Sequence, residues 1–186
     1  MQAIYDSIHA GRLHAKVGVV ISDKVNAKVL EIAAAAGIPA VCIERKNFTS
    51  KQEFETAIAK ELTQYQVDLV VLAGFMRILS ANFVNLFSGR IINIHPSLLP
   101  AFPGLDAHQQ AIDYGAKVSG CTIHFVDEGM DTGPIIMQQA VPIFADDTAD
   151  SLAERILRVE HELYPEAIGL YCEQRLFITG RNVKII

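Results

Sequence analysis

The sequence predicts an α/β fold with a doubly wound, mostly parallel sheet and helices on both faces. Three observations predict it. Short runs rich in β-branched residues alternate along the chain with longer segments of helical period. These runs are apolar on both faces, as parallel strands are when helices cover both sides of the sheet. Of the 186 residues, 51% are hydrophobic and 20% charged, which is typical of one compact domain with a sizeable core.

The first two thirds of the chain supply most of the predicted elements. Gly37, followed by Ile38-Pro39, is expected to end one helix and begin a strand, and Ser50 with Glu53 forms a capping box at the start of the next helix. The expected elements are a helix at Met1–Ala10, strands at Val17–Ile21, Ile38–Ile43, Val67–Ala73, Arg90–Ile94 and Thr122–Val126, and intervening helices at Lys24–Ala36 and Ser50–Tyr65.

The last third is predicted to be mainly helical. The pattern is helical from Thr148 to Glu162, and Pro165 is expected to start another helix because proline favours the first helical turn. The terminal stretch Arg175–Ile186 is strand-like. The stretch Pro100–Ala107 is expected to be a loop that can close over a site and exclude water. With no repeat or linker, we expect a single domain over residues 1–186.

Composition narrows the functional class. A net charge of −5 with few basic clusters does not favour nucleic-acid binding. The chain has an odd number of cysteines, Cys42, Cys121 and Cys172, and none of them forms a CxxC motif. We therefore expect no disulfide framework and no metal site. The sequence has no leader and no apolar run near the roughly 20 residues of a membrane span, so we expect a cytoplasmic protein without membrane association. Small-molecule substrates are expected, and the oligomeric state stays open, a homodimer included.

Two polar residues stand at the end of a predicted strand. In open parallel sheets ligands bind beyond the carboxyl ends of the strands. The run Ile91–Ser97 alternates and then reaches Pro96, so Asn93 and His95 are expected to project to the same side. An Asn-x-His pair at a strand end more often bonds only to nearby backbone. The surroundings favour a functional interpretation.

A second polar cluster, Asp127–Pro134, follows the predicted strand Thr122–Val126. Aspartate and glycine dominate turns for backbone reasons, so a solvated turn is the alternative interpretation. A carboxylate placed beside an imidazole raises the histidine's pKa and lets it hold a proton near neutral pH. With an amide at Asn93 to stabilise an oxyanion, Asn93, His95 and Asp131 make a candidate acyl-transfer site.

Three motifs share their order and spacing with a known family. They are LAGFMRIL at Leu72–Leu79, NIHPSLLP at Asn93–Pro100 and DTGP at Asp131–Pro134. From Met1 to about Ile168 the chain resembles the glycinamide ribonucleotide formyltransferase family, which has a Rossmann-like formyltransferase fold. Pro103-Gly104 and Glu160-His161 favour this member of the wider superfamily. The resemblance implies formyl transfer from 10-formyltetrahydrofolate to the amine of 5′-phosphoribosylglycinamide in purine synthesis, without a metal.

The resemblance also implies roles for individual residues. Asn93 and His95 would be catalytic, and Asp131 would raise the pKa of His95. Glu160 would contact the nucleotide substrate. Folate contacts would come from Lys51, Met76, Arg77, Ile78, Leu79 and Asn93. Without the resemblance, Lys51 and Glu160 would be interpreted as solvated helix charges, and Met76, Ile78 and Leu79 as core residues. His108, His124 and His161 are expected to pack around the site and not to bind ligand.

The amino end departs from the family pattern. The family has a strand and a glycine- and asparagine-containing loop before the helix that matches Gln2–Ala10, and the backbone N–H groups of that loop hold the substrate phosphate. Neither is present, so we expect an amino-terminally truncated domain. The strand lies in the middle of the family's sheet, and its loss would leave two strand edges unpaired.

Three other functions fit part of the pattern. Formyltetrahydrofolate deformylase uses a similar Asn, His and Asp with water as acceptor, and usually carries an additional amino-terminal regulatory domain. Methionyl-tRNA formyltransferase needs a further carboxyl-terminal domain for tRNA. A non-catalytic folate- or nucleotide-binding module is the third alternative. Dependence of tetrahydrofolate release on glycinamide ribonucleotide would separate them.

Overall fold

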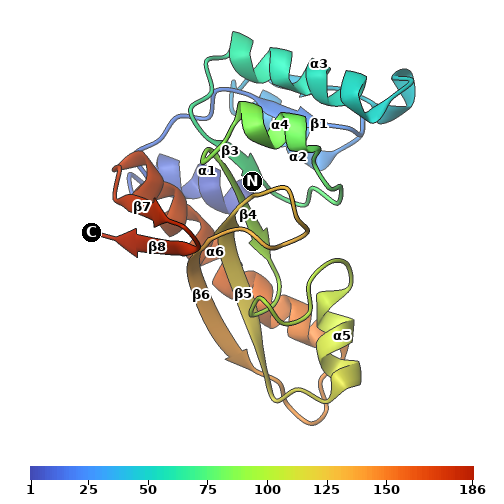
Figure 1. Ribbon diagram of the computed structural model, residues 1–186, viewed down its shortest axis with the longest axis vertical. Helices are drawn as coiled ribbons and strands as arrows, with labels where there is room; N and C mark the ends of the chain where they lie inside the picture. The colour runs from blue at the N-terminus through green and yellow to red at the C-terminus, as the bar shows by residue number, and fades with distance from the viewer.

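The computed structural model describes residues 1–186. Figure 1 shows strands and helices alternating along the chain. The elements are α1 (Gln2–His9), β1 (Val20–Ser22), α2 (Lys28–Ala35), β2 (Ala40–Cys42), a 3₁₀ helix (Arg45–Asn47), α3 (Lys51–Gln64), β3 (Val70–Leu72), α4 (Ala81–Leu86), β4 (Ile91–His95), α5 (Ala107–Tyr114), β5 (Val118–Phe125), β6 (Ile135–Pro142), α6 (Ala149–Cys172), β7 (Leu176–Thr179) and β8 (Asn182–Ile185).

The strands form two sheets. β1 and β2 pair in parallel as a two-stranded sheet, and the other six follow the order β3-β4-β5-β6-β8-β7. Within the larger sheet β3–β4 and β6–β8 are parallel, whereas β4–β5, β5–β6 and β7–β8 are antiparallel. The predicted α/β fold class is confirmed, with mixed pairing. β5–β6 and β7–β8 are joined by loops without a helix, which suffice for antiparallel neighbours, whereas the connection between β4 and β5 contains α5.

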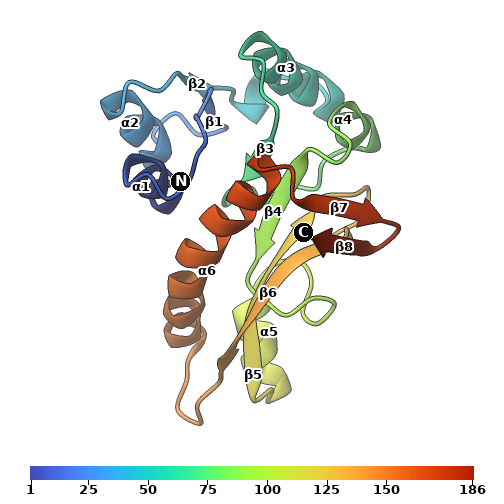
Figure 2. The same cartoon turned by 90° about the vertical axis from the view of Figure 1, so that its left-hand side faces the viewer.

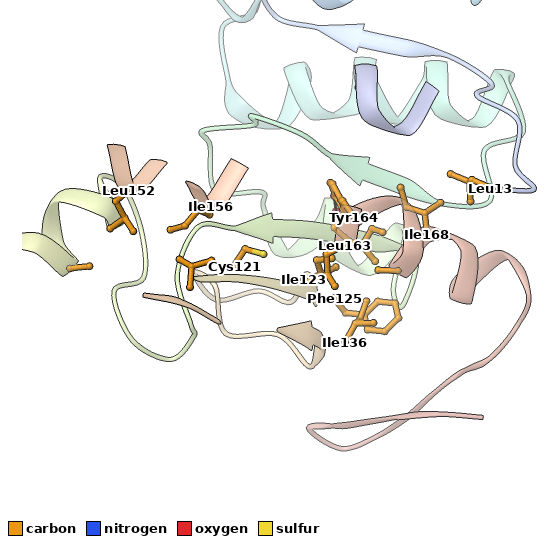
Figure 3. Close-up of a cluster of buried hydrophobic side chains, with 14 residues drawn as sticks. Leu13, Cys121, Ile123, Phe125, Ile136, Leu152, Ile156, Leu163, Tyr164 and Ile168 are labelled. Carbon is orange, nitrogen blue, oxygen red and sulfur yellow. Dashed lines mark hydrogen bonds between the residues drawn. The ribbon is translucent and has the colours of Figure 1, made fainter. Parts of the chain in front are cut away.

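Helices cover both faces of the sheet, and each face has its own core. Ile92 of β4 and Ile123 of β5 pack with α6 in one cluster. Ile91 of β4 packs with side chains of α3 and α4, among them Phe54 and Phe83, in the other. Neighbouring strand residues therefore point to opposite cores. Figure 2 shows α6 along one face of β4, β5 and β6, and Figure 3 shows α6 side chains packed against β5.

The helix boundaries predicted at Gly37 and Ser50 agree with the structure. Gly37 adopts a φ of 68° directly after the α2 cap, a conformation that glycine adopts without steric cost. Ser50 caps α3, and its Oγ accepts the Glu53 N–H at 3.1 Å. The Glu53 carboxylate does not return to Ser50. It accepts instead from the N–H (3.0 Å) and the hydroxyl (2.7 Å) of Thr49.

The expected helix start at Pro165 is wrong. α6 continues through Pro165 from Ala149 to Cys172, after a capping box between Thr148 and Ser151. Pro165 is itself buried, and packing of α6 on the sheet holds both halves of the helix in line despite the backbone hydrogen bond that proline cannot donate. Neither α6 nor any other helix has the length and apolar character of a membrane span.

Four elements were not predicted: the 3₁₀ helix, α4, α5 and β6. α4 has six residues, too few for a clear period. β6 has an exposed stretch at Gln138–Ala140, which weakens its apolar signal. The strand-like terminal stretch is confirmed, and it forms two strands, β7 and β8, joined by a turn at Gly180 with a φ of 58°.

Candidate active site

The carboxyl ends of β3 and β4 lie together, because these two strands are parallel. Leu72 of β3 pairs with Asn93 of β4, and Asn93 pairs in turn with His124 of β5. Asn93 and His95 are two residues apart on one strand and so share a face, as the sequence predicted. His124 projects from the same face, because directly opposite residues of antiparallel strands point the same way. The strand ends thus bring three polar side chains to one place.

His95 lies between two oxygen acceptors. Its Nε2 is 2.8 Å from the carbonyl oxygen of Phe102, and its Nδ1 is 3.4 Å from Oδ2 of Asp131. A neutral imidazole has one proton and would turn a lone pair toward one of these oxygens, whereas an imidazolium donates to both. His95 is buried, at 4% exposure, so solvent screens these contacts little. The geometry suits the protonated ring that a general acid requires.

The loop that carries Asp131 is shaped by its own residues. Oδ1 of Asp127 accepts the Thr132 hydroxyl proton at 2.7 Å. Asp131 has a φ of 55°, in the left-handed region that aspartate enters more readily than most residues. At Gly133 a Cβ atom would lie 1.7 Å from the carbonyl oxygen of Phe125. Glycine is therefore required there for the loop to pass close to β5 and aim Asp131 at His95.

The predicted loop Pro100–Ala107 contacts both partners of this pair. The Phe102 carbonyl accepts from His95, and the Gly104 N–H donates to Oδ2 of Asp131 at 2.8 Å. Gly104 has a φ of 80°, which favours glycine at this position. The loop is confirmed as irregular, and it packs over the His95–Asp131 pair.

His124 fixes the orientation of Asn93. Its Nδ1 donates to the Phe125 carbonyl at 2.9 Å, so in the neutral ring Nε2 has a lone pair. Asn93 Nδ2 lies 3.4 Å from that Nε2 and donates to it. Burial lowers the pKa of His124, and this outweighs the opposing effects of the Phe125 carbonyl and of Asp131, whose Oδ1 is 3.7 Å away. The neutral ring leaves the second Asn93 amide proton free for a ligand.

The predicted folate-contact segment follows β3 directly and leaves the sheet beside Asn93. Met76 and Ile78 are exposed, at 75% and 56%, and Leu79 is buried in the core. The Arg77 guanidinium bonds the Asp23 carboxylate at 2.8 and 3.1 Å. Met76 and Ile78 thus offer exposed apolar side chains on this segment, and Leu79 anchors it in the core.

Two predicted binding residues, Lys51 and Glu160, are not bonded to the cluster. Lys51 begins α3, and its Nζ is 3.8 Å from the carboxylate of Glu55. Glu160 is half-buried on α6, and burial raises the pKa of its carboxyl. No hydrogen bond or ion pair joins Lys51 or Glu160 to Asn93, His95 or Asp131.

His124 was expected to pack around the site, and it contacts both Asn93 and Asp131. Thr122 was given no role, yet its buried hydroxyl donates to the Ser97 carbonyl at 2.7 Å and accepts the Leu99 N–H at 3.0 Å. Thr122 therefore shapes the turn after His95. Both are polar residues at alternate positions between the apolar residues Cys121, Ile123 and Phe125 of β5, which is the signal that could have identified them.

The donors of the cluster can act on one oxygen. An amide N–H of Asn93 and a ring N–H of His95 are arranged on one face to polarise a carbonyl and to stabilise the oxyanion formed on addition. His95, held by Asp131, can then give a proton to a leaving group. No group of three or more His, Cys, Asp or Glu side chains is arranged to hold a metal ion.

Comparison with known proteins gives matches over nearly the whole chain. Residues 1–168 match the formyl transferase family. The phosphoribosylglycinamide formyltransferase of Bacillus subtilis is 46% identical over 98% of this chain and 92% of its own length. A crystal structure of glycinamide ribonucleotide transformylase 1 from Symbiobacterium toebii is 51% identical, covers 100% of this chain and 87% of that one, and superposes with a TM-score of 0.97.

Some curated relatives are far longer. The trifunctional purine biosynthetic protein adenosine-3 of Drosophila melanogaster is 49% identical over 91% of this chain, which spans only 13% of that protein. The match to the family covers 168 of the 186 residues, and it includes the three motifs and the loops that carry the polar cluster. The chain therefore belongs to the formyl transferase family.

Proposed function

We propose that this chain transfers a formyl group from 10-formyltetrahydrofolate to the amine of 5′-phosphoribosylglycinamide, a step of de novo purine synthesis. The observation that carries the proposal is the contact of His95 with Asp131 at the strand end that also presents Asn93. The names of the similar proteins support the choice of acceptor. Small molecules as sole partners, the cytoplasm as location and a homodimer as assembly belong to the same proposal.

In the proposed mechanism the substrate amine attacks the formyl carbon, and the formyl oxygen gains negative charge. Asn93 donates its free amide proton to that oxygen, and the His95 imidazolium donates a second hydrogen bond. His95 then delivers a proton to the departing folate nitrogen and takes up one from the attacking amine, which restores the imidazolium, so no covalent enzyme intermediate is needed. The Phe102 carbonyl accepts the Nε2 proton in the structure, so substrate competes with that carbonyl for it.

Binding of the folate is proposed at the segment after β3 and at Asn93. The exposed side chains of Met76 and Ile78 suit an aromatic ligand, and Arg77 and Leu79 would contribute mainly backbone, because Asp23 engages the Arg77 guanidinium and Leu79 is buried. Lys51 is proposed to pair with a folate carboxylate. Glu160 is proposed to bind the nucleotide. No metal takes part in the proposed reaction.

The test is whether tetrahydrofolate release from 10-formyltetrahydrofolate depends on added glycinamide ribonucleotide. Dependence with formation of the formylated nucleotide supports the proposal. Release without acceptor would indicate the deformylase reaction, and formylation of methionyl-tRNA would indicate the tRNA branch. Absence of turnover together with folate-induced thermal stabilisation would indicate a binding module.

A further inference from the structure

Glu55 is a buried carboxylate that the proposed mechanism does not use. It lies on α3 with 4% of the residue exposed. It accepts the Ser80 N–H at 2.9 Å and also the Ser80 hydroxyl proton, and the Lys51 ammonium is 3.8 Å away. A buried charge is costly unless it is paired and hydrogen-bonded. All hydrogen bonds to the Glu55 carboxylate come from Ser80, so this carboxylate holds the end of the segment Ala73–Ser80 that follows β3.

Ser80 closes the segment Ala73–Ser80 and caps α4. Its hydroxyl donates to Glu55 and accepts the Phe83 N–H at 3.3 Å. Leu79, beside it, is buried in the α3 and α4 core. The carboxyl end of the segment is thus fixed in the protein interior.

The rest of the segment has weaker restraints. Its first residue follows Leu72, the end of β3. Its middle is tied to the body of the protein by Arg77 and Asp23, whose side chains are 49% and 26% exposed. An ion pair this exposed contributes about 0–1 kcal/mol. The buried contact to Glu55 is therefore the main polar restraint on the segment.

We propose that Glu55 is a positioning residue for the folate co-substrate. It contacts both parts of the proposed folate site: Ser80 at the end of the Met76–Leu79 stretch, and Lys51 one helical turn away on α3. The Glu55 carboxylate thereby fixes the position of the Met76–Leu79 stretch relative to the Lys51 ammonium. The inference rests on the proposed function, because it takes folate as the ligand of that surface.

The test is Glu55→Gln. Glutamine is neutral, and in either orientation its amide N–H₂ replaces one of the two carboxylate oxygens that accept from Ser80, so the anchor of the segment is weakened. We expect the KM for 10-formyltetrahydrofolate and the Kd for tetrahydrofolate to rise roughly tenfold or more, as loss of a hydrogen bond to a charged group implies. The kcat should change less than about threefold, and the KM for glycinamide ribonucleotide should be unchanged.

Glu53→Gln is the matched control. Glu53 is on the same helix, and its carboxylate also accepts two hydrogen bonds, but from Thr49 and not from the segment. The Glu53→Gln variant should lose some thermal stability and keep the parental KM and Kd for folate. Equal rises of the folate KM and Kd in Glu53→Gln and Glu55→Gln would show a general effect of weakening α3 and would overturn the inference.

Ser80→Ala is the second variant, and it removes the hydroxyl but keeps the N–H. Its effect on folate Kd should be smaller than that of Glu55→Gln, and the double variant should show less than the sum, because both remove one contact. Folate Kd within twofold of the parent in folded Glu55→Gln overturns the inference. If Glu55→Gln does not fold, an unchanged Kd in Ser80→Ala overturns it. A parent chain that binds tetrahydrofolate but transfers no formyl group counts against the proposed function alone.

Discussion

Asp131 is the residue at which the parts of the site meet. Its Oδ2 accepts the Gly104 N–H and faces Nδ1 of His95, and its Oδ1 lies 3.7 Å from Nε2 of His124. Its φ of 55° is a conformation that asparagine also adopts readily. Substitution by asparagine therefore removes the charge and leaves the loop conformation in place.

We expect Asp131→Asn and His95→Ala each to lower kcat by about 10²–10⁴, the usual contribution of a positioned proton donor. Both variants should remain folded by circular dichroism. Asp113→Asn, on the exposed side of α5, is the control and should keep its kcat. Near-parental turnover in either folded site variant would remove that residue from the mechanism.

His124 makes stability depend on pH. Burial lowers its pKa in the folded protein below the ordinary value of 6.5. As pH falls below about 6.5, the unfolded chain takes up a proton that the folded chain resists, so stability decreases. Burial lowers the pKa of His108 in the same direction, with His95 adding to the shift, so the two histidines act together.

We expect His124→Gln to reduce the loss of stability between about pH 6.5 and pH 5, with the part due to His108 remaining. Urea unfolding at a series of pH values measures the slope. The exposed His161, changed to glutamine in the same way, is the control. An unchanged slope in His124→Gln would mean that protonation of this ring does not oppose folding.

At the scale of elements, α6 carries a carboxylate, Glu160, whose negative charge destabilises the folded protein. Glu160 is half-buried and has no hydrogen bond or ion pair, and burial raises the pKa of its carboxyl above the ordinary 4.5. The folded protein then binds this proton more tightly than the unfolded chain. Stability is present in full below about pH 4.5 and decreases as pH rises through the folded-state pKa. A residue that lowers the stability of the folded protein in this way is a candidate for a functional role, because a destabilising residue can persist where the function requires it.

We expect Glu160→Gln to raise the melting temperature at pH 7 by roughly 2–4 °C, the shift that about 1 kcal/mol gives at this size. At pH 4 the difference should vanish. If Glu160 binds the nucleotide as proposed, the KM for glycinamide ribonucleotide should rise in the same variant. Glu154→Gln, exposed on the same helix, is the control for both measurements. A lower melting temperature at pH 7 would contradict the assigned cause.

Local signals predicted elements well where the chemistry was local. Ser50 and Gly37 mark helix ends in the structure as in the sequence, because caps depend on a few neighbouring residues. Pro165 misled because the packing of α6 on the sheet overrides a local preference. The capping box at Glu53 was only half correct, since a nearby hydroxyl on Thr49 competed for the carboxylate.

At the scale of the whole molecule, the site joins segments that are distant in sequence. The motifs predicted that Asn93, His95 and Asp131 belong together, and the structure places Asp131 beside His95. His124 was expected near the site, but its contacts with Asn93 and Asp131 depend on the register of β4 with β5, which no local pattern specifies. The contact of Glu55 with Ser80 could not be predicted for a similar reason, since the two residues are 25 positions apart in the sequence.

The division of the strands into two sheets bears on stability. β1 and β3 each stand at the end of a sheet with one free edge, yet Val19 and Ile21 pack in the same core cluster as Val70 and Leu72. Val20 and Val70 are each only 9% exposed. Free edges of nearly buried strands leave backbone groups without partners, which is unfavourable. We propose that one more strand fits between β1 and β3.

The test is to extend the chain upstream of Met1 with a strand and a glycine-rich loop of the family type. The extended protein should have a higher melting temperature, because the strand would pair both free edges. Its affinity for glycinamide ribonucleotide, measured by calorimetry, should rise more than its affinity for folate, because loop N–H groups at the start of α1 would hold the phosphate. The proposed folate contacts, Met76 to Leu79, are already in place. If the shorter chain binds glycinamide ribonucleotide as tightly as the extended one, the phosphate has another site and the proposed strand and loop are wrong.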